Sequence, residues 1–489
     1  MRCGCITHLH PNHDGLSEGL EHGTHGIMKQ EDRMTKSKKK MTAVAPSMRV
    51  AIAGTGYVGI VTAACLAEHG YDVTCVDVDP RKLEQLERDG RSGIYEAGLD
   101  VLLRKNRRRL SYTTDAGAAY READIIFICV GTPENRDGSA NLHYVYEAAA
   151  QVAEAAQREC VLVVKSTVPI GTNERVEKLI HRHRDEHASR IHVASNPEFL
   201  SQGTAVHDTM HASRIVIGVE DDFARERLLA LYQEFPAPKL VTNRRSAEMI
   251  KYASNDFLAL KISYINEIAN LCEEVGADVD DVARGMGYDK RIGSQFLKAG
   301  IGYGGSCFPK DTKALHWLSS YHEHEMKTVK AAIEVNDHQK LRLLRKARKY
   351  YEELEDLTVA VLGLTFKPGT DDLREAPSLV NVPLLLEEGA VVRVYNPVGM
   401  DRFREQFPTQ VTYCDDIDMA LQGADFCLIL TDWPEIRAYD PAGFKKHMRH
   451  AVVLDGRNCY ALEDMKAAGI IYESIGRQYG GGGHKRGED

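Results

Sequence analysis

Short apolar segments alternate with longer segments of helical composition along most of the chain, a pattern typical of parallel α/β sheets. The apolar run 49–53 is followed by Gly-Thr-Gly-Tyr-Val-Gly at 54–59, a helical stretch at 60–69 and a second apolar run at 73–76 that ends at Asp77. A strand, a helix and a second strand in this order predict a βαβ unit.

Three further apolar runs, at 123–130, 161–165 and 191–194, each end in polar residues and proline. The segments that follow them are Gly-Thr-Pro, Ser-Thr-Val-Pro and Asn-Pro-Glu-Phe-Leu. Ligands of open parallel sheets lie beyond the carboxyl ends of the strands. We therefore expect Thr132, Thr167 and Glu198 to border one crevice together with the glycine segment.

A second α/β set follows, with apolar runs at 358–362, 391–395, 424–430 and 451–454. It has no Gly-x-Gly-x-x-Gly, but Lys367, Arg374 and Arg457 follow its strands and indicate an anionic ligand such as a nucleotide diphosphate. We expect the substrate to bridge the two halves.

The segment 246–275 has helix-forming composition, contains no proline and ends before Gly276. At 1.5 Å per residue such a helix would span about 45 Å. Apolar residues occur around much of its circumference, which suits a helix buried between domains or at a homodimer contact. A charged helical stretch, 329–351, is expected before the second α/β set. The fold class is therefore α/β, with two Rossmann-like doubly wound domains joined by a long central helix.

The glycine segment has the features of a dinucleotide site. Gly54 permits a tight turn, Gly56 lets the backbone approach a pyrophosphate, and Gly59 allows close packing of helix and strand. Asp77 can accept hydrogen bonds from a ribose and would repel a 2′-phosphate, so NAD is favoured over NADP.

The segment 302–311, Gly-Tyr-Gly-Gly-Ser-Cys-Phe-Pro-Lys-Asp, presents Cys307 on a glycine-rich loop. A thiolate beside a nicotinamide can attack an aldehyde, and the resulting thiohemiacetal can lose hydride to give a thioester, which water cleaves. Lys251 and Asn255, four positions apart, share one face of the long helix and can hold an oxyanion or a water. Lys310 and Asp311 can tune the thiolate fraction of the cysteine, in a direction that the sequence leaves open.

The chain of 489 residues is long enough for two to four domains. Its 62 Lys and Arg against 71 Asp and Glu give a net charge of −9, which argues against nucleic acid or an anionic membrane as partner. No apolar run approaches the ~18 residues of a membrane helix. Eleven scattered cysteines indicate a reducing, cytoplasmic location.

Residues 1–47 lack the apolar core of a secretory signal, and we expect a disordered leader or translation from Met41 or Met48. The segment 8–14, His-Leu-His-Pro-Asn-His-Asp, resembles the metal loop of the metallo-β-lactamase fold, with asparagine in place of a metal-binding aspartate. No folded frame is expected around it, so no metal site is predicted. Residues 479–489 are expected to form a flexible tail.

Residues 48–476 carry these motifs in the order found in the UDP-glucose 6-dehydrogenases, within the nucleotide-sugar dehydrogenase family, which the chain closely resembles. The resemblance implies a homodimer or higher oligomer, NAD as cofactor and a UDP-sugar as substrate. It implies an NAD-binding domain at 48–243, a central helical domain with the cysteine loop at 244–355, and a UDP-sugar-binding domain at 356–478.

The resemblance also implies roles for individual residues. Cys307 would be the nucleophile, Asp311 its helper, Lys251 and Asn255 the oxyanion-holding pair, Glu198 a base in thioester hydrolysis, and Thr132 a residue that holds water or cofactor. The implied NAD contacts are Gly54, Gly56, Tyr57, Val58, Gly59, Asp77, Lys82, Thr132 and Arg374. The implied substrate contacts are Phe199, Leu200, Lys251, Asn255, Arg291, Lys298, Gly304, Phe366, Lys367 and Arg457, with Arg291 reaching a neighbouring subunit's substrate.

The chain departs from the family pattern at Gln202, where many members have glutamate, and at Asn396, where aspartate is usual. The first change removes a charge near the nicotinamide. One alternative is a dehydrogenase of another nucleotide sugar such as UDP-N-acetylmannosamine, whose loop tends to read Gly-Gly-His-Cys-Ile-Pro; Ser306, Phe308 and Lys310 favour glucose. A second alternative is a nucleotide-binding sensor without catalysis, against which the complete set of catalytic residue types argues.

Overall fold

A computed structural model of the chain describes residues 48–185 and 187–478, and the predictions made for the leader and the tail fall outside these residues. No helix in the described ranges has the length and apolar character needed to span a bilayer.

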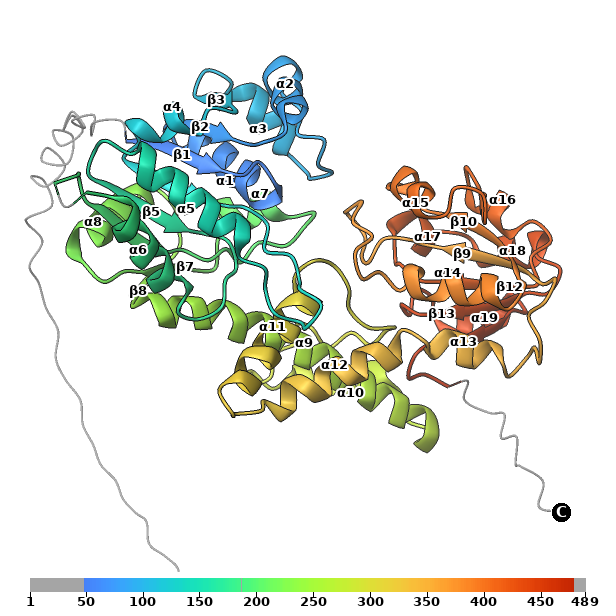
Figure 1. Ribbon diagram of the computed structural model, residues 1–489. Coiled ribbons are helices and arrows are strands. Elements are labelled where there is room, and N and C mark those ends of the chain that lie inside the picture. Colours follow the sequence, from blue (N-terminus) through green and yellow to red (C-terminus); the bar gives the residue numbers. More distant parts are fainter. Residues whose placement is uncertain (1–47, 186, 479–489) are drawn as a thin grey trace, which may run out of the picture. The chain divides into compact units, whose positions relative to one another are not determined.

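The first half contains an eight-stranded sheet of order β3-β2-β1-β4-β5-β6-β7-β8 (Figure 1). All neighbouring strands are parallel except β6 and β7, which pair antiparallel through Ser195 and Gly218. The strands are β1 (Arg49–Ala53), β2 (Asp72–Val76), β3 (Leu110–Thr113), β4 (Ile125–Ile128), β5 (Cys160–Val164), β6 (Ile191–Ser195), β7 (Ile215–Gly218) and β8 (Lys239–Thr242).

Helices cover both faces of this sheet, so the predicted doubly wound arrangement is confirmed. Val50 and Ile52 of β1 pack into one core, whereas Ala51 and Ala53 pack into the other, because successive side chains of a strand point to opposite faces. The helices are α1 (Tyr57–Glu68), α2 (Pro80–Asp89), α3 (Leu99–Lys105), α4 (Ala116–Arg121), α5 (His143–Ala155), α6 (Thr172–His183), α7 (Ala205–Met210) and α8 (Asp222–Leu231).

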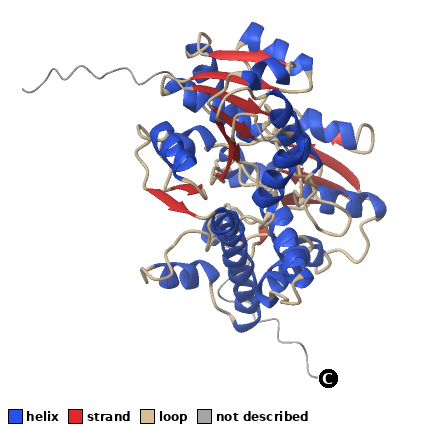
Figure 2. Cartoon of the chain, turned by 60° about the vertical axis from the view of Figure 1, so that its left-hand side comes forward, coloured by secondary structure: helices blue, strands red, loops and turns tan. Residues whose placement is uncertain are grey.

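The long helix α9 (Arg244–Val275) begins two residues earlier than expected. The side chain of Asn243 caps it by accepting a hydrogen bond from the Ser246 backbone N–H at 2.7 Å, and Gly276 ends it in the left-handed conformation. Figure 2 shows helices and strands along the whole described chain.

Four shorter helices follow α9: α10 (Val279–Gly287), α11 (Phe308–Tyr321), α12 (Lys327–Gln339) and α13 (Arg342–Ala347). The single helical stretch expected at 329–351 is thus two helices. The Asn381 side-chain amide donates to the Lys340 carbonyl oxygen at 2.9 Å, and this tertiary contact binds the carbonyl where the helix is interrupted.

The second sheet is six-stranded and wholly parallel, in the order β11-β10-β9-β12-β13-β14. Its strands are β9 (Thr358–Leu362), β10 (Val391–Tyr395), β11 (Thr412–Tyr413), β12 (Phe426–Ile429), β13 (Val452–Asp455) and β14 (Ile471–Glu473). Its helices are α14 (Ser378–Glu387), α15 (Met400–Gln406), α16 (Ile417–Leu421), α17 (Pro434–Arg437), α18 (Pro441–His447) and α19 (Leu462–Ala467). Two cores enclose it, so this half is also doubly wound, as predicted.

Candidate active site

The glycine segment forms the turn from β1 into α1. Gly54 has φ +93°, and a Cβ on Gly59 would lie 1.9 Å from the Gly54 carbonyl oxygen, so a side chain at 59 would force strand and helix apart. Gly56 is the N-cap of α1 and has open space where a Cβ would stand. The free N–H groups at this end of α1 fit a pyrophosphate.

Asp77 is fixed beside this turn. Its Oδ2 accepts hydrogen bonds from the Thr55 backbone N–H at 2.8 Å and from the Thr55 hydroxyl at 2.6 Å. Burial opposes the charged carboxylate, yet these bonds, a backbone bond from Asp79 and the positive charge of Lys82 hold the pKa of Asp77 below its ordinary value. An ionised carboxylate at this position fits a ribose diol.

Two other residues of the predicted cofactor site make contacts within the protein. The Tyr57 hydroxyl donates to the Glu96 carboxylate and accepts from the Gly203 N–H at 2.9 Å. The Val58 carbonyl oxygen accepts from the Thr62 hydroxyl within α1.

Cys307 is the N-cap of α11, at the end of the glycine-rich loop. A Cβ on Gly304 would lie 2.3 Å from the Glu375 carbonyl oxygen and 2.9 Å from Cβ of Phe366, and the Gly305 N–H donates to the Arg374 carbonyl oxygen at 2.7 Å. The contacts that require glycine here are thus with segment 366–375 of the second half. The loop joins the two halves at the cysteine.

The Cys307 thiol is half-buried and lies 3.7 Å from the Ser306 hydroxyl. Burial, and then the negative charge of Glu198, raise the pKa of this thiol, whereas Lys251 lowers it. The direction of the shift, which the sequence left open, is upward.

A buried ion pair and a carboxylate–amide pair stand next to the thiol. Lys251 Nζ lies 2.8 Å from Glu198 Oε1, and Asn255 Nδ2 lies 2.7 Å from Asp311 Oδ2. Burial alone would lower the pKa of Lys251, but Glu198, Cys307 and Asp311 together raise it above its ordinary value. The structure thus brings together five of the six predicted catalytic residues.

Thr132, the sixth, has a separate set of contacts. Its hydroxyl donates to the Thr167 carbonyl oxygen at 3.0 Å, joining the segments that follow β4 and β5. The sequence placed these two threonines at one crevice, and the hydrogen bond shows that they are neighbours.

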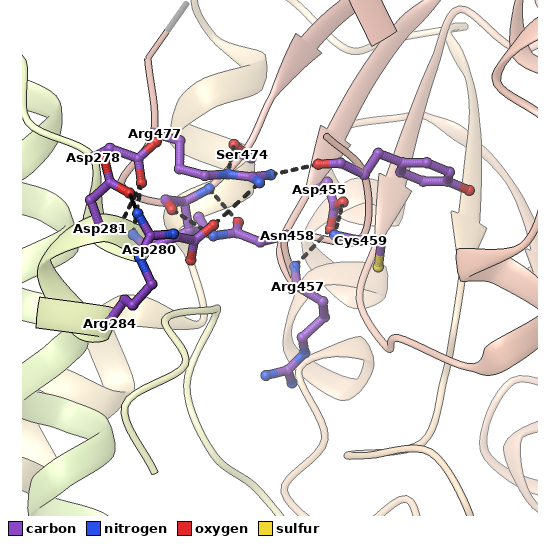
Figure 3. Close-up of polar contacts among 12 residues, drawn as sticks. Asp278, Asp280, Asp281, Arg284, Asp455, Arg457, Asn458, Cys459, Ser474 and Arg477 are labelled. Carbon is purple, nitrogen blue, oxygen red and sulfur yellow. Dashed lines mark hydrogen bonds and ion pairs between the residues drawn. The ribbon is translucent and has the colours of Figure 1, made fainter. Parts of the chain in front are cut away.

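Arg457 is held by main-chain carbonyl groups of three separate segments. Its guanidinium donates to the carbonyl oxygens of Leu430 at 2.9 Å, Gly302 at 3.0 Å and Phe366 at 3.4 Å. Its backbone N–H donates to Asp455 at 2.7 Å, and in Figure 3 the guanidinium points away from that carboxylate. Burial lowers the pKa of Arg457.

The remaining predicted contacts fall into two groups. Some lie at the junction of the halves: Lys367 Nζ is 2.8 Å from Ser201 Oγ, and Leu200 N–H donates to Glu198 Oε2 at 2.8 Å. The ring of Phe199 lies between two cations, with the Arg214 guanidinium 3.8 Å and Lys251 Nζ 5.5 Å from its centroid.

The second group consists of two exposed cations, each paired with an aspartate. Lys298 pairs with Asp432 at 2.7 Å, and Arg291 pairs with Asp289 at 2.6 Å with its side chain almost fully exposed. Among the described residues, the hydrogen bonds and ion pairs of Arg291 are confined to Asp289, and its expected role at a neighbouring subunit's substrate stays a prediction.

Two charged residues near the site were missed in the sequence. Lys165, directly after β5, is buried and donates to Asn196 Oδ1 at 3.0 Å. It lines a cavity of about 270 Å³ that Glu198 also lines. A lysine ending an apolar strand is the signal that could have found it. Asp372 binds Arg374 with Oδ2–Nη2 at 2.6 Å, and its place two residues before the arginine is the corresponding signal.

A dinucleotide turn with an acid that fits a ribose, a second α/β domain and a thiol where the two meet define an NAD-dependent dehydrogenase. Three domain profiles of the UDP-glucose/GDP-mannose dehydrogenase family match the chain: the NAD binding domain at 48–236, the central domain at 245–338 and the UDP binding domain at 360–462. The chain belongs to the UDP-glucose/GDP-mannose dehydrogenase family.

Known relatives align with the chain over nearly their whole lengths. The chain is 49% identical to the UDP-glucose 6-dehydrogenase YwqF of Bacillus subtilis (strain 168), over 88% of this chain and 98% of the relative. It is 44% identical to a UDP-glucose 6-dehydrogenase of Rhizobium meliloti (strain 1021), over 88% and 100%. A UDP-glucose dehydrogenase structure from Pyrobaculum islandicum superimposes with a TM-score of 0.84 at 40% identity, covering 89% of this chain and 99% of that one.

Proposed function

We propose that the protein oxidises UDP-glucose to UDP-glucuronate with two NAD, through a covalent intermediate on Cys307. The observation that carries this proposal is the position of the Cys307 thiol beside the Lys251–Glu198 and Asn255–Asp311 pairs. The relatives named UDP-glucose 6-dehydrogenase support the choice of substrate.

Binding divides between the two halves. The open N-terminus of α1 and the Asp77 carboxylate would hold NAD, which when bound supplies the acceptor for hydride from the sugar. Lys367 and Arg457 of the second half, together with Gly304 of the central cysteine loop, would receive the UDP-sugar. The domain boundaries 48–243, 244–355 and 356–478 remain our proposal for how the chain divides these tasks.

The chemistry at the sugar's terminal carbon takes two oxidations. The alcohol first loses a proton and a hydride and becomes an aldehyde. The Cys307 thiolate then forms a C–S bond to the carbonyl carbon, giving a thiohemiacetal whose loss of a second proton and hydride leaves a thioester. The Lys251 ammonium and the Asn255 amide would hold the oxygen of the reacting carbon as its charge develops.

Hydrolysis completes the reaction. Water adds to the thioester carbonyl, the C–S bond breaks, and the carboxylate leaves while the thiol recovers its proton. Glu198 is suited to take a proton from this water and Asp311 to assist through Asn255, because both carboxylates are buried next to the thiol. One alcohol, one water and two NAD are consumed for each acid formed.

The test is NADH formation with a panel of nucleotide sugars, counted per molecule of product. We expect UDP-glucose to be preferred and two NADH to form per acid. Preference for UDP-N-acetylmannosamine would support the alternative dehydrogenase, in keeping with the 28% identical UDP-D-ManNAc dehydrogenase structure from Pyrococcus horikoshii, with a TM-score of 0.77. If none of the sugars leads to reduction of NAD, the result would support the alternative of a nucleotide-binding sensor without catalysis.

A Cys307→Ser variant tests the covalent step. It should bind NAD and lose acid formation, because a serine hydroxyl is far less ionised than a thiol. Cys459→Ser is the matched control, since Cys459 is the other cysteine among the described residues that is not fully buried. Acid formation by the Cys307 variant at the native rate would overturn the covalent route.

We also propose a homodimer or a higher oligomer that uses α9. Phe257, Tyr264 and Leu271 follow one another at seven-residue intervals and are 61%, 49% and 56% exposed, so they form one apolar stripe along this helix. A Tyr264→Glu variant that leaves the mass measured by light scattering unchanged would count against this interface.

A cytoplasmic location completes the proposal. All nine cysteines within the described part of the chain are free thiols, which suits a reducing compartment.

A further inference from the structure

The carboxyl group of Asp256 is buried close to the proposed site, and no donor from the described part of the chain binds it. Asp256 follows Asn255 on α9 and is only 5% exposed. Neither of its side-chain oxygens has a hydrogen-bond partner among the described residues. Buried polar groups are almost always paired, because a buried charge without partners is costly.

The donors near Asp256 are bound to a second carboxylate, that of Asp311. The Asp311 carboxylate on α11 accepts hydrogen bonds from Asn255 Nδ2 at 2.7 Å and from Lys310 Nζ at 2.6 Å. Asp311 is more deeply buried than Asp256. One amide and one ammonium therefore donate to Asp311, and Asp256 receives neither of them.

Two tyrosines are the other titratable groups whose interaction with Asp256 is seen among the described residues, and neither provides a positive charge. Tyr252 lies one turn earlier on α9, and Tyr303 lies in the glycine-rich loop; both interact electrostatically with Asp256. The carboxylate of Glu248 faces Tyr252 and is bound by Gly171 and Asn173, and Asp337 of α12 acts on Tyr303.

Two neighbouring carboxyl groups in a buried place do not both ionise at neutral pH. Burial and then the negative charge of Asp311 raise the pKa of Asp256 to about 8, and Lys310 lowers it less than they raise it. Of the two carboxyl groups, Asp256 is the one whose oxygens receive no donor among the described residues, so it is the one suited to keep its proton.

We propose that Asp256 is a positioning residue that stays protonated at neutral pH, so that Asp311 alone carries negative charge behind Asn255 and keeps Lys310 and Asn255 in place. Ionisation of Asp256 puts a second charge in competition for Lys310 and loosens the hold of Asp311 on Asn255. This inference rests on the proposed function, in which Asn255 and Asp311 serve the Cys307 thiol.

The first experiment is infrared spectroscopy of the full chain across pH, which needs no catalysis. The spectrum of the native protein minus that of the Asp256→Asn variant should show the carbonyl band of a protonated carboxylic acid at pH 6 to 7. This band should fade as the pH passes about 8. A carboxylate band at pH 7 in place of this signal would overturn the proposal.

The second experiment is the pH profile of kcat. At pH 9 the ionised form of a group with a pKa of about 8 outnumbers its neutral form about tenfold. The ratio of kcat at pH 9 to kcat at pH 7 should therefore be about tenfold higher in Asp256→Asn than in the native enzyme. Asp337→Asn, the same change at an exposed acid, should keep the native ratio.

The two readouts separate the two hypotheses. If the protein oxidises no nucleotide sugar, the proposed function fails while the infrared titration still decides where the proton resides. If the carbonyl band titrates but kcat of Asp256→Asn falls between pH 7 and pH 9 as much as kcat of the native enzyme, the positioning role is wrong. Asp256→Ala, which also removes the acid, gives the same comparison should the asparagine variant fold poorly.

Discussion

The side-chain amide of Gln202 donates a hydrogen bond to the carboxylate of Asp372, with Nε2 and Oδ2 3.0 Å apart. The same carboxylate binds the Arg374 guanidinium, and Thr370 donates to the amide oxygen of Gln202 at 3.3 Å. The glutamine that replaces a usual glutamate therefore ties the segment after β6 to the segment of the second half that carries a proposed NAD contact.

A Gln202→Glu variant should weaken use of NAD. The new carboxylate would face Asp372 and compete for Arg374, and loss of one charged hydrogen bond costs about 1.5–3 kcal/mol, or roughly 10- to 100-fold. We expect kcat/KM for NAD to fall by about that factor in steady-state assays. A second change, Asp372→Asn, should recover part of the loss, and strictly additive effects in this double-mutant cycle would contradict the contact.

Lys251→Met should impair both activity and stability. It leaves the buried Glu198 carboxylate without its ammonium partner, a change that costs about 3–5 kcal/mol. The free energy of unfolding from denaturant titration and kcat should both fall. Lys251→Met combined with Glu198→Leu should recover stability but not activity. If the double variant stays as unstable as the single one, loss of the ion pair does not explain the loss of stability.

The reactivity of Cys307 should increase steeply with pH. Burial and Glu198 raise the pKa of this thiol above the ordinary value of 9.0, so the thiolate fraction is still increasing with pH at pH 9. Alkylation by iodoacetamide in the Cys459→Ser background should follow this slope. A rate that levels off below pH 8 would show a thiol with a lowered pKa.

Gly304→Ala should reduce activity through a steric clash, because the backbone conformation of Gly304 is one that alanine can adopt. The added Cβ would meet the Glu375 carbonyl oxygen at 2.3 Å, and backbone cannot give way as a flexible side chain can. We expect kcat/KM for UDP-glucose to fall at least tenfold, about 1.4 kcal/mol. Gly285→Ala in α10 is the control, because open space surrounds the position of its Cβ; equal losses in the two variants would contradict the argument.

The sequence predicted those parts of the fold in which neighbouring residues decide the outcome. β1, β9 and β10 have the expected bounds, because four apolar residues in a run of five are enough to indicate a buried strand. The two-residue β11 and the antiparallel pairing of β7 were not predicted, since they depend on which strand lies beside them.

In the candidate site, too, the local features were predicted and the features that depend on distant segments were not. The motif around Cys307 and the spacing of Lys251 and Asn255 are local, and they indicated the right neighbourhood. The carbonyl contacts of Arg457, the partner of Gln202 and the unpaired carboxyl of Asp256 arise between segments far apart in the chain, where composition carries no signal.

The guanidinium of Arg457 binds main-chain oxygens, which every amino acid possesses, in three different loops. Mutations that alter side chains at Leu430 or Phe366 therefore leave this anchor intact, provided that the backbone keeps its path. A single arginine thus sets the spacing between these three loops without depending on the side chains at Leu430 and Phe366.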